Sequence, residues 1–390
     1  MRALRTIVVV LLVSLGFLGG YFVGWFLHGE NVVRLSGTER NEARKAANLQ
    51  QRVIEELEGR YYKPVDAEKL GQAGVRGTLK SLDDPYTVYL SPEETRAFEE
   101  KESGEYSGIG ASLQKSDKGL VITSVFPGSP AAAAGLKPGD VIVSVDGAPT
   151  RNTSIDTSIT RIKGKEGTQV KLEIKPKNGA TKQVSVTRRT IQIPETRKSM
   201  KKAGGEKVGY VQLYDFGGYA SRDVRRDIEA LAKKGAQSFI LDLRYNGGGL
   251  LSQAVDVTGV FQTGLVTSTK GLHSPLEELE ASGPVATGKP LVLLVNGYSA
   301  SASEIVTGAL KDRGRAEIIG TRTFGKGLVQ SIVPLGNDAA LKLTTAVYLT
   351  PNGININKKG ITPDIFVVEK PKTKKDEQLQ AALRYLARQP

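Results

Sequence analysis

Residues 290–305 read PLVLLVNGYSASASEI, and this stretch decides the fold. Five consecutive apolar residues, 291–295, are typical of a strand buried on both faces of a parallel sheet. The polar residues after them lead into residues 301–314, where apolar positions recur at helical spacing. Chemistry in open parallel sheets usually sits in the loops where strands end. The stretch therefore predicts a strand, a functional loop and a helix.

The same pattern extends along the chain from about Gly209. Further apolar strands are expected in VGYVQLY, SFILDLRYN and AEIIGT, with amphipathic helices at 221–235 and 250–261. Continuous apolar strands that alternate with such helices indicate a largely parallel sheet with helices on its faces. We therefore expect an α/β core over residues 189–370, followed by an amphipathic C-terminal helix over residues 371–390. Packing onto the core and a dimer contact both fit the apolar face of that helix.

The chain before the core divides into two differently patterned regions. Residues 38–105 favour a helical arm, in which Ser91, Pro92 and Glu94 form the start signal of one helix. Residues 106–188 show short alternating strands, Gly-Asp and Asn-Gly turns, an Ala-rich helix ending at Gly135 and a further helix at 153–163. This second region predicts a small β module inserted before the core.

Residues 6–27 are uncharged and mostly apolar, and as a helix they would reach roughly 33 Å, enough to cross a bilayer. No small-residue cleavage site follows them, so residues 1–28 are predicted to be a signal anchor. Arg2 and Arg5 precede the span, which places the N-terminus in the cytoplasm and the rest outside. We expect a single-pass protein of the bacterial cytoplasmic membrane with the rest of the chain in the periplasm.

The composition limits which catalytic residues the chain can use. The 390 residues include no cysteine and two histidines, which excludes thiol nucleophiles and leaves His28 or His273 for any Ser-His-Asp triad. His28 lies at the membrane boundary and His273 in a polar stretch, so neither favours catalysis. The net charge of +13 is concentrated in residues 161–202 without interleaved aromatics, so we expect no nucleic-acid partner.

Candidate catalytic groups follow two predicted strands. The glycines of YNGGG, residues 245–249, allow backbone N–H groups to face negative charge. Ser299, Ser301 and Ser303 lie at a strand-to-helix junction, where a helix N-terminus favours an oxyanion. We expect Ser303 to be only the N-cap of that helix.

A nucleophilic serine needs a base, and Lys326 is the better candidate. The stretch GTRTFGKG, residues 320–327, is one residue short of a phosphate-binding P-loop, because Gly327 replaces the required Ser or Thr. A lysine has a pKa of ~10.4 in water, but burial disfavours its charged form and makes it a base. The flanking glycines allow Lys326 to turn inward, where Gln330 would orient its amine.

The ordered motifs LDLRYNGGGLLSQAV, VNGYSASASEIVTGALKD and GTRTFGKGLVQ closely resemble the carboxyl-terminal processing peptidases, which are tail-specific serine proteases. Nearly the whole chain takes part, since residues 106–188 resemble the family's PDZ domain. The resemblance implies a ClpP/crotonase-like α/β core in a multi-domain chain and a serine-lysine dyad that needs no metal or cofactor.

The resemblance also implies roles for individual residues. Ser301 would be the nucleophile and Lys326 the base, assisted by Gln330. The backbone N–H groups of Gly248 (or Gly249) and Ala302 would form the oxyanion hole, and Glu304 and Asp312 would be supporting acids. The loop that receives a peptide C-terminus would consist of Gly108, Ile109, Gly110 and Ala111. Lys163 stands where the family usually has arginine, which puts any regulatory contact made through a guanidinium in doubt.

We therefore expect a membrane-anchored serine endopeptidase that takes protein or peptide substrates with free C-termini. The alternatives are an inactive PDZ adaptor that only binds peptides, and a crotonase-like acyl-CoA enzyme, which an extracytoplasmic location and a PDZ module disfavour. A homodimer and an activating adaptor partner are left open by the sequence.

Overall fold

The computed structural model describes residues 36–370 and 375–389. The predicted membrane anchor, residues 1–28, lies outside these residues. Within the described part of the chain, no helix combines the length and the apolar character that a membrane crossing requires. The chain divides into two compact units, one ending at Asp84 and one beginning at Pro85.

The first unit is a helical pair, α2 (Gly37–Arg60) and α3 (Ala67–Lys80). Ser36 caps α2 in a reciprocal arrangement with the carboxylate of Glu39, and Asp66 caps α3 by accepting from the backbone N–H of Lys69. Such caps satisfy backbone donors that the first helical turn leaves without partners. The helical prediction for this region is confirmed for both segments.

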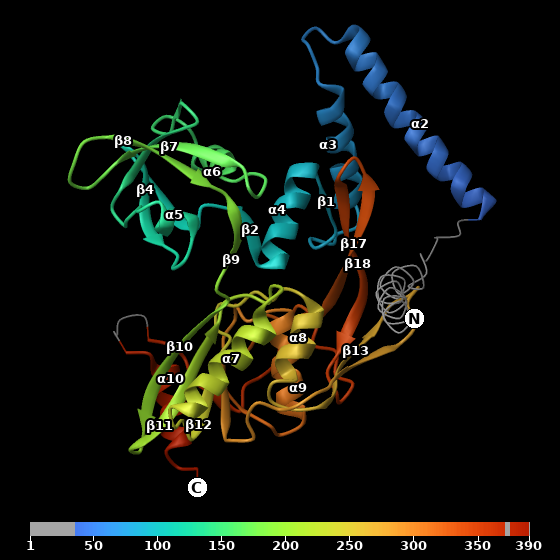
Figure 1. Ribbon diagram of the computed structural model, residues 1–390. Coiled ribbons are helices and arrows are strands. Elements are labelled where there is room, and N and C mark those ends of the chain that lie inside the picture. Colours follow the sequence, from blue (N-terminus) through green and yellow to red (C-terminus); the bar gives the residue numbers. More distant parts are fainter. Residues whose placement is uncertain (1–35, 371–374, 390) are drawn as a thin grey trace, which may run out of the picture. The chain divides into compact units, whose positions relative to one another are not determined.

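A six-stranded sheet forms the centre of the second unit (Figure 1). Its strands, in spatial order, are β10 (Thr196–Ala203), β11 (Glu206–Leu213), β12 (Ser238–Asp242), β15 (Leu291–Val295), β16 (Glu317–Gly320) and β19 (Ile365–Phe366). All neighbours pair in parallel except β10 and β11. Every residue of β12 and β15 is buried, as their continuous apolar sequences predict.

Helices cover both faces of this sheet. One face packs against α7 (Ala220–Lys233), α8 (Leu251–Thr258) and α9 (Ala302–Asp312). The other face packs against α10 (Glu377–Leu386), whose Ala382 and Leu386 are buried on Ile240 and Val292. The C-terminal helix is therefore a packed terminal helix, and its apolar face is used within the chain.

A second sheet was not expected from the α/β pattern, and it forms one side of the cleft that is described below. It contains β1 (Val88–Leu90), β18 (Ala339–Leu349), β13 (Gly264–Lys270) and β14 (Glu277–Ala281), with β17 (Leu328–Gly336) paired to β18. Asn337 and Asp338 both have positive φ and close the β17–β18 hairpin, as a primed turn requires. Helix α4 (Pro92–Ser103) begins with the predicted Ser91–Glu94 capping box and packs against β18.

The inserted β module has its own core. It holds β3 (Ala111–Ser116), β4 (Gly119–Val125), β5 (Val141–Val145), β6 (Ala148–Pro149), β7 (Gln169–Lys175), β8 (Lys182–Thr187), α5 (Pro130–Ala133) and α6 (Ile155–Ile162). The pair β2 (Glu105–Gly108) and β9 (Arg189–Gln192) forms the entry and exit of the module. Both helices predicted here, before Gly135 and within 153–163, are confirmed.

Candidate active site

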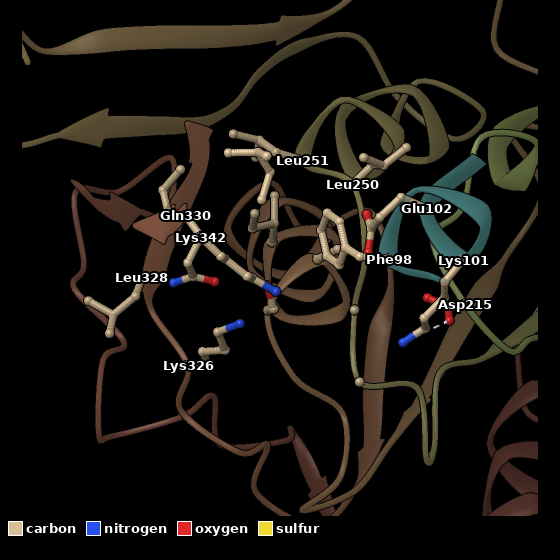
Figure 2. Close-up of a pocket in the computed structure, with 18 of the residues that line it drawn as sticks. Phe98, Lys101, Glu102, Asp215, Leu250, Leu251, Lys326, Leu328, Gln330 and Lys342 are labelled. Carbon is tan, nitrogen blue, oxygen red and sulfur yellow. Dashed lines mark ion pairs between the residues drawn. The ribbon is translucent and has the colours of Figure 1, made fainter. Parts of the chain in front are cut away.

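A cleft of about 600 Å³ in the second unit gathers residues from distant parts of the chain. Six of the predicted site residues line it: Ser301, Lys326, Gln330, Gly248, Gly249 and Ala302. They come from the loop after β12, the start of α9, the segment before β17 and β17 itself. Figure 2 shows the side chains of Lys326 and Gln330 directed into this space, with α4 residues on its opposite side.

Ser301 occupies a strained position at the first turn of α9. Its backbone has φ 55° and ψ −116°, a region that residues with a Cβ rarely adopt. Ser301 is the N-cap of the helix, so the N–H of Ala302 belongs to the helix N-terminus, and Ala302 lines the cleft. The prediction that Ser303 is the N-cap was wrong. The N-cap lies two residues earlier, at Ser301, and Ser303 is fully buried with its hydroxyl donating to the carbonyl of Asn246 at 2.9 Å.

The glycine-rich loop approaches Ser301 closely. A Cβ added to Gly248 would lie 2.8 Å from both the carbonyl oxygen of Ala300 and the Cβ of Ser301, so only glycine allows this approach. The N–H of Gly248 donates to Oδ1 of the buried Asn246 at 2.9 Å. In contrast, within residues 36–370 the N–H groups of Gly249 and Ala302 have no hydrogen-bond acceptor. Asn246 was not expected to hold this loop, because its amide carries no motif signal.

Glu304 connects the serine segment to the lysine segment. Its carboxylate is fully buried and accepts four hydrogen bonds: from the N–H of Ser301 (3.0 Å), the N–H of Gly325 (2.7 Å), the N–H of Lys326 (2.9 Å) and the hydroxyl of Thr323 (2.6 Å). Burial raises the pKa of Glu304, and these hydrogen bonds oppose the rise. One side chain thus fixes the backbone of both candidate catalytic residues.

Tyr348 makes a second connection between the same two segments. Its hydroxyl lies 2.7 Å from the carbonyl oxygen of Lys326 and 3.2 Å from that of Ser301. The amine of Lys326 lies 4.8 Å from the centre of the Tyr86 ring. Gln330 has a buried Nε2 without a hydrogen-bond partner among the described residues. Buried hydrogen bonds therefore hold the backbone around both candidate residues, while Nε2 of Gln330 is left without a partner among the described residues.

Two other candidates lie away from the cleft. Asp312 is at the C-terminal end of α9, where its carboxylate accepts from the N–H of Asn352 at 2.9 Å. That contact holds the turn after β18 and does not reach the cleft. His273 is exposed in the loop between β13 and β14.

The expected peptide-binding loop lies in the β module. Ile109 is buried in the core of the module, and its carbonyl accepts from the N–H of Ala131 at 2.8 Å. The ring of Tyr106 lies against Gly108, where an added Cβ would come within 2.8 Å of a ring carbon. Lys163 forms an ion pair with Glu100 of α4.

Comparison with known proteins assigns each region to a family. Residues 207–367 match the model of peptidase family S41, residues 98–175 match the PDZ domain, and residues 15–95 match the N-terminal domain of the activating protease CtpB. The carboxyl-terminal-processing protease of Picosynechococcus is 38% identical over 83% of this chain and 81% of the relative. The carboxy-terminal processing protease CtpA of Bacillus subtilis is 35% identical over 80% of this chain and 67% of the relative.

A solved photosystem II D1 C-terminal processing protease is also similar, with 30% identity, coverage of 86% of this chain and 90% of that chain, and a TM-score of 0.49. The multi-domain α/β fold and the family expected from the motifs are both confirmed by the sequence relatives. The chain belongs to the carboxyl-terminal-processing serine proteases of peptidase family S41, with a PDZ domain.

Proposed function

We propose that this protease cleaves polypeptides with Ser301 as the nucleophile and Lys326 as the general base. The observation that carries the proposal is the carboxylate of Glu304, which binds the backbone N–H groups of both residues at 3.0 and 2.9 Å. A buried acid that spans two distant segments holds them in one geometry, as positioned catalytic groups require.

The chemistry proceeds in two halves. The hydroxyl oxygen of Ser301 attacks the scissile carbonyl carbon while its proton passes to the neutral amine of Lys326. Lys326 then gives that proton to the leaving amine, and the amide bond breaks to leave an ester on Ser301. Water attacks the ester in the second half, with Lys326 again taking and returning the proton, and the free enzyme is restored.

The oxyanion of each tetrahedral intermediate needs N–H donors that no other group occupies. Ala302 and Gly249 meet this condition, and the helix N-terminus at Ala302 adds its dipole. Gly248 supports the hole through close backbone packing, with its own N–H bound to Asn246. Gln330 orients the amine of Lys326 through its amide.

The PDZ domain selects the substrate end. The backbone of Gly108, Ile109, Gly110 and Ala111 receives the terminal carboxylate, and the peptide extends the sheet as an added strand. Protein or peptide tails with free C-termini are therefore the substrates. An adaptor that only binds peptides does not need the strained backbone of Ser301 or a lysine side chain directed into the same cleft, so these features favour the protease.

We also propose that residues 1–28 anchor the chain in the cytoplasmic membrane, with the protease outside the cytoplasm. The uncharged run at 6–27 and the arginines before it support this orientation. Fractionation of cells that express the full chain, with protease added to intact spheroplasts, tests the location. Protection of the catalytic domain from the added protease would contradict it.

The central experiment incubates residues 36–390 with a disordered protein and maps the cuts by mass spectrometry. Cleavage by the wild type and none by Ser301→Ala supports the mechanism. Equal cleavage by both proteins would contradict it, and binding without cleavage by both would favour the adaptor.

A further inference from the structure

Lys342 is a second lysine of the catalytic cleft. It lies on β18 and points into the space beside Lys326 and Gln330 (Figure 2). Its amine lies 4.8 Å from the centre of the Phe98 ring of α4. Within the described residues it has no hydrogen-bond acceptor and no carboxylate within ion-pair distance. An ammonium group this close to an aromatic face is partly desolvated, which strengthens its interaction with any anion that enters.

A second unsatisfied donor lies on the adjacent strand. Nε2 of Gln330 is buried without a partner, and β17 pairs directly with β18, with Ile332 opposite Lys342. Buried polar groups in folded proteins almost always have partners, so an orphan donor that lines a cleft indicates a missing acceptor. Two donors on neighbouring strands define a site for a group with more than one acceptor oxygen.

Charged groups of both signs line the cleft around Lys342. Glu102 is the nearby acid, and burial followed by the charge of Asp215 raises its pKa. Burial lowers the pKa of Lys342, while Glu102 raises it and Lys101 lowers it. Asp215 pairs with Lys101 at 3.5 Å, and Glu102 acts on Lys342 without forming an ion pair with it, so the amine of Lys342 can still pair with an anion that enters the cleft.

We propose that Lys342, with Gln330, binds a carboxylate of the substrate inside the catalytic cleft. The inference rests on the proposed function, because the substrate of this site is then a polypeptide. A polypeptide offers a carboxylate from an Asp or Glu side chain near the cleaved bond, or from the C-terminus of a short tail. Leu250, Leu251 and Ile332 line the same cleft and accommodate the apolar part of the bound segment.

The test measures kcat/KM for one cleavable peptide series with residues 36–390. Each peptide carries Asp or Asn at a single position on either side of the cleaved bond, and each is made with a free or an amidated C-terminus. Wild type is compared with Lys342→Met, which keeps the length of the side chain, and Lys342→Arg, which keeps its charge. Lys101→Met is the matched control, since that lysine also lines the cleft but is paired with Asp215.

The wild type should prefer Asp over Asn at one position by roughly tenfold, the value expected for one charge-assisted hydrogen bond. Lys342→Met should bring the ratio of kcat/KM for the Asp and Asn peptides to about one. Lys342→Arg should keep most of this preference, and Lys101→Met should change the ratio less than about twofold. Glu102→Gln should increase the ratio, because it removes the competing charge. If Lys342→Met instead removes only the difference between free and amidated peptides, the carboxylate is the C-terminus.

Two outcomes would overturn the proposal. In the first, wild type cleaves all peptides at equal rates. In the second, wild type prefers acidic peptides and Lys342→Met keeps that preference. Failure of the proposed function looks different, since Ser301→Ala would then cleave the Asn peptides as well as wild type does. Circular dichroism melting of each variant confirms that the compared proteins are folded.

Discussion

Ser301 and Lys326, 25 positions apart in sequence, donate their backbone N–H groups to the same oxygen, Oε2 of Glu304. The shared acceptor explains why a fully buried carboxylate is tolerated: four donors surround it in place of water. It also means that the geometry of the proposed dyad depends on a third side chain, to which the mechanism gives no chemical step.

Glu304→Gln should lower kcat by roughly ten- to hundredfold with a smaller effect on KM. The glutamine offers one oxygen for four donors, so buried N–H groups lose their acceptor at about 1 to 3 kcal/mol each. Steady-state kinetics on a peptide gives both parameters. Glu280→Gln, an exposed acid on β14, is the control and should behave as wild type. An unchanged kcat for Glu304→Gln would show that the shared acceptor is dispensable.

Ser301→Ala should abolish cleavage, whereas Ser299→Ala and Ser303→Ala should mainly reduce stability. The hydroxyl of Ser299 donates to the carbonyl of Leu243 at 2.8 Å, and that of Ser303 donates to Asn246 at 2.9 Å. Each loss should cost about 1 kcal/mol of unfolding free energy. Denaturant unfolding and peptide cleavage separate the two effects. Wild-type turnover by Ser301→Ala would refute its role as the nucleophile.

Lys326→Arg should be inactive although it preserves the positive charge. A guanidinium stays protonated at every pH that the protein survives, so it cannot accept the serine proton. Cleavage assays between pH 6 and 9 check this, with His273→Ala as the active control, since His273 is exposed and outside the cleft. Inactivation by His273→Ala would show that the base has been misassigned.

The sequence predicted the residues of the cleft but not how their polar groups are used. Ser301, Lys326 and Gln330 could be named because each stands in a motif at a strand end. The N–H of Gly248 was expected to face the substrate, and only the folded loop shows it bound to Asn246. A side chain can accept a hydrogen bond from the backbone N–H two residues later, and this local bond competes with other acceptors for the same N–H. No residue pattern reveals which acceptor the N–H binds.

The second sheet was missed for a different reason. Lys342 pairs with Val88 in one direction and Ile332 in the other, and the first of these contacts spans more than half of the chain. Strand partners at such separations depend on tertiary packing, which local alternation does not specify. As a result, the helical arm was predicted without β1, and the lysine that β18 directs into the cleft went unnoticed.

Glu195 should make stability depend on pH. It is 3% exposed at the start of the core, and burial raises its pKa to about 7, with Asp215 and Asp223 adding to the rise and the N–H groups of Gly217 and Tyr219 opposing it. Because the folded pKa exceeds the unfolded value of 4.5, the folded state holds the proton more tightly. This stabilisation is complete below pH 4.5 and is lost as the pH rises toward 7.

The loss from this one group is about 3 kcal/mol at ~1.4 kcal/mol per pKa unit. The free energy of unfolding, measured with urea at pH 5 and pH 8, should therefore decline less between these pH values for Glu195→Gln than for wild type. Glu206→Gln, an exposed acid, should decline as wild type does. Equal declines for wild type and Glu195→Gln would mean that the carboxyl titrates normally.

Amidation of a substrate C-terminus should weaken binding to the PDZ loop by roughly ten- to hundredfold, since it removes a charge-assisted interaction of about 1.5 to 3 kcal/mol. Amidation keeps the length of the peptide and removes only the terminal charge, so the difference between the two forms reports on recognition of the carboxylate.

The measurement is fluorescence anisotropy of labelled peptides with residues 36–390 carrying Ser301→Ala, which prevents cleavage during titration. Each peptide is compared in free and amidated form. Equal affinities for the two forms would exclude end recognition by Gly108–Ala111.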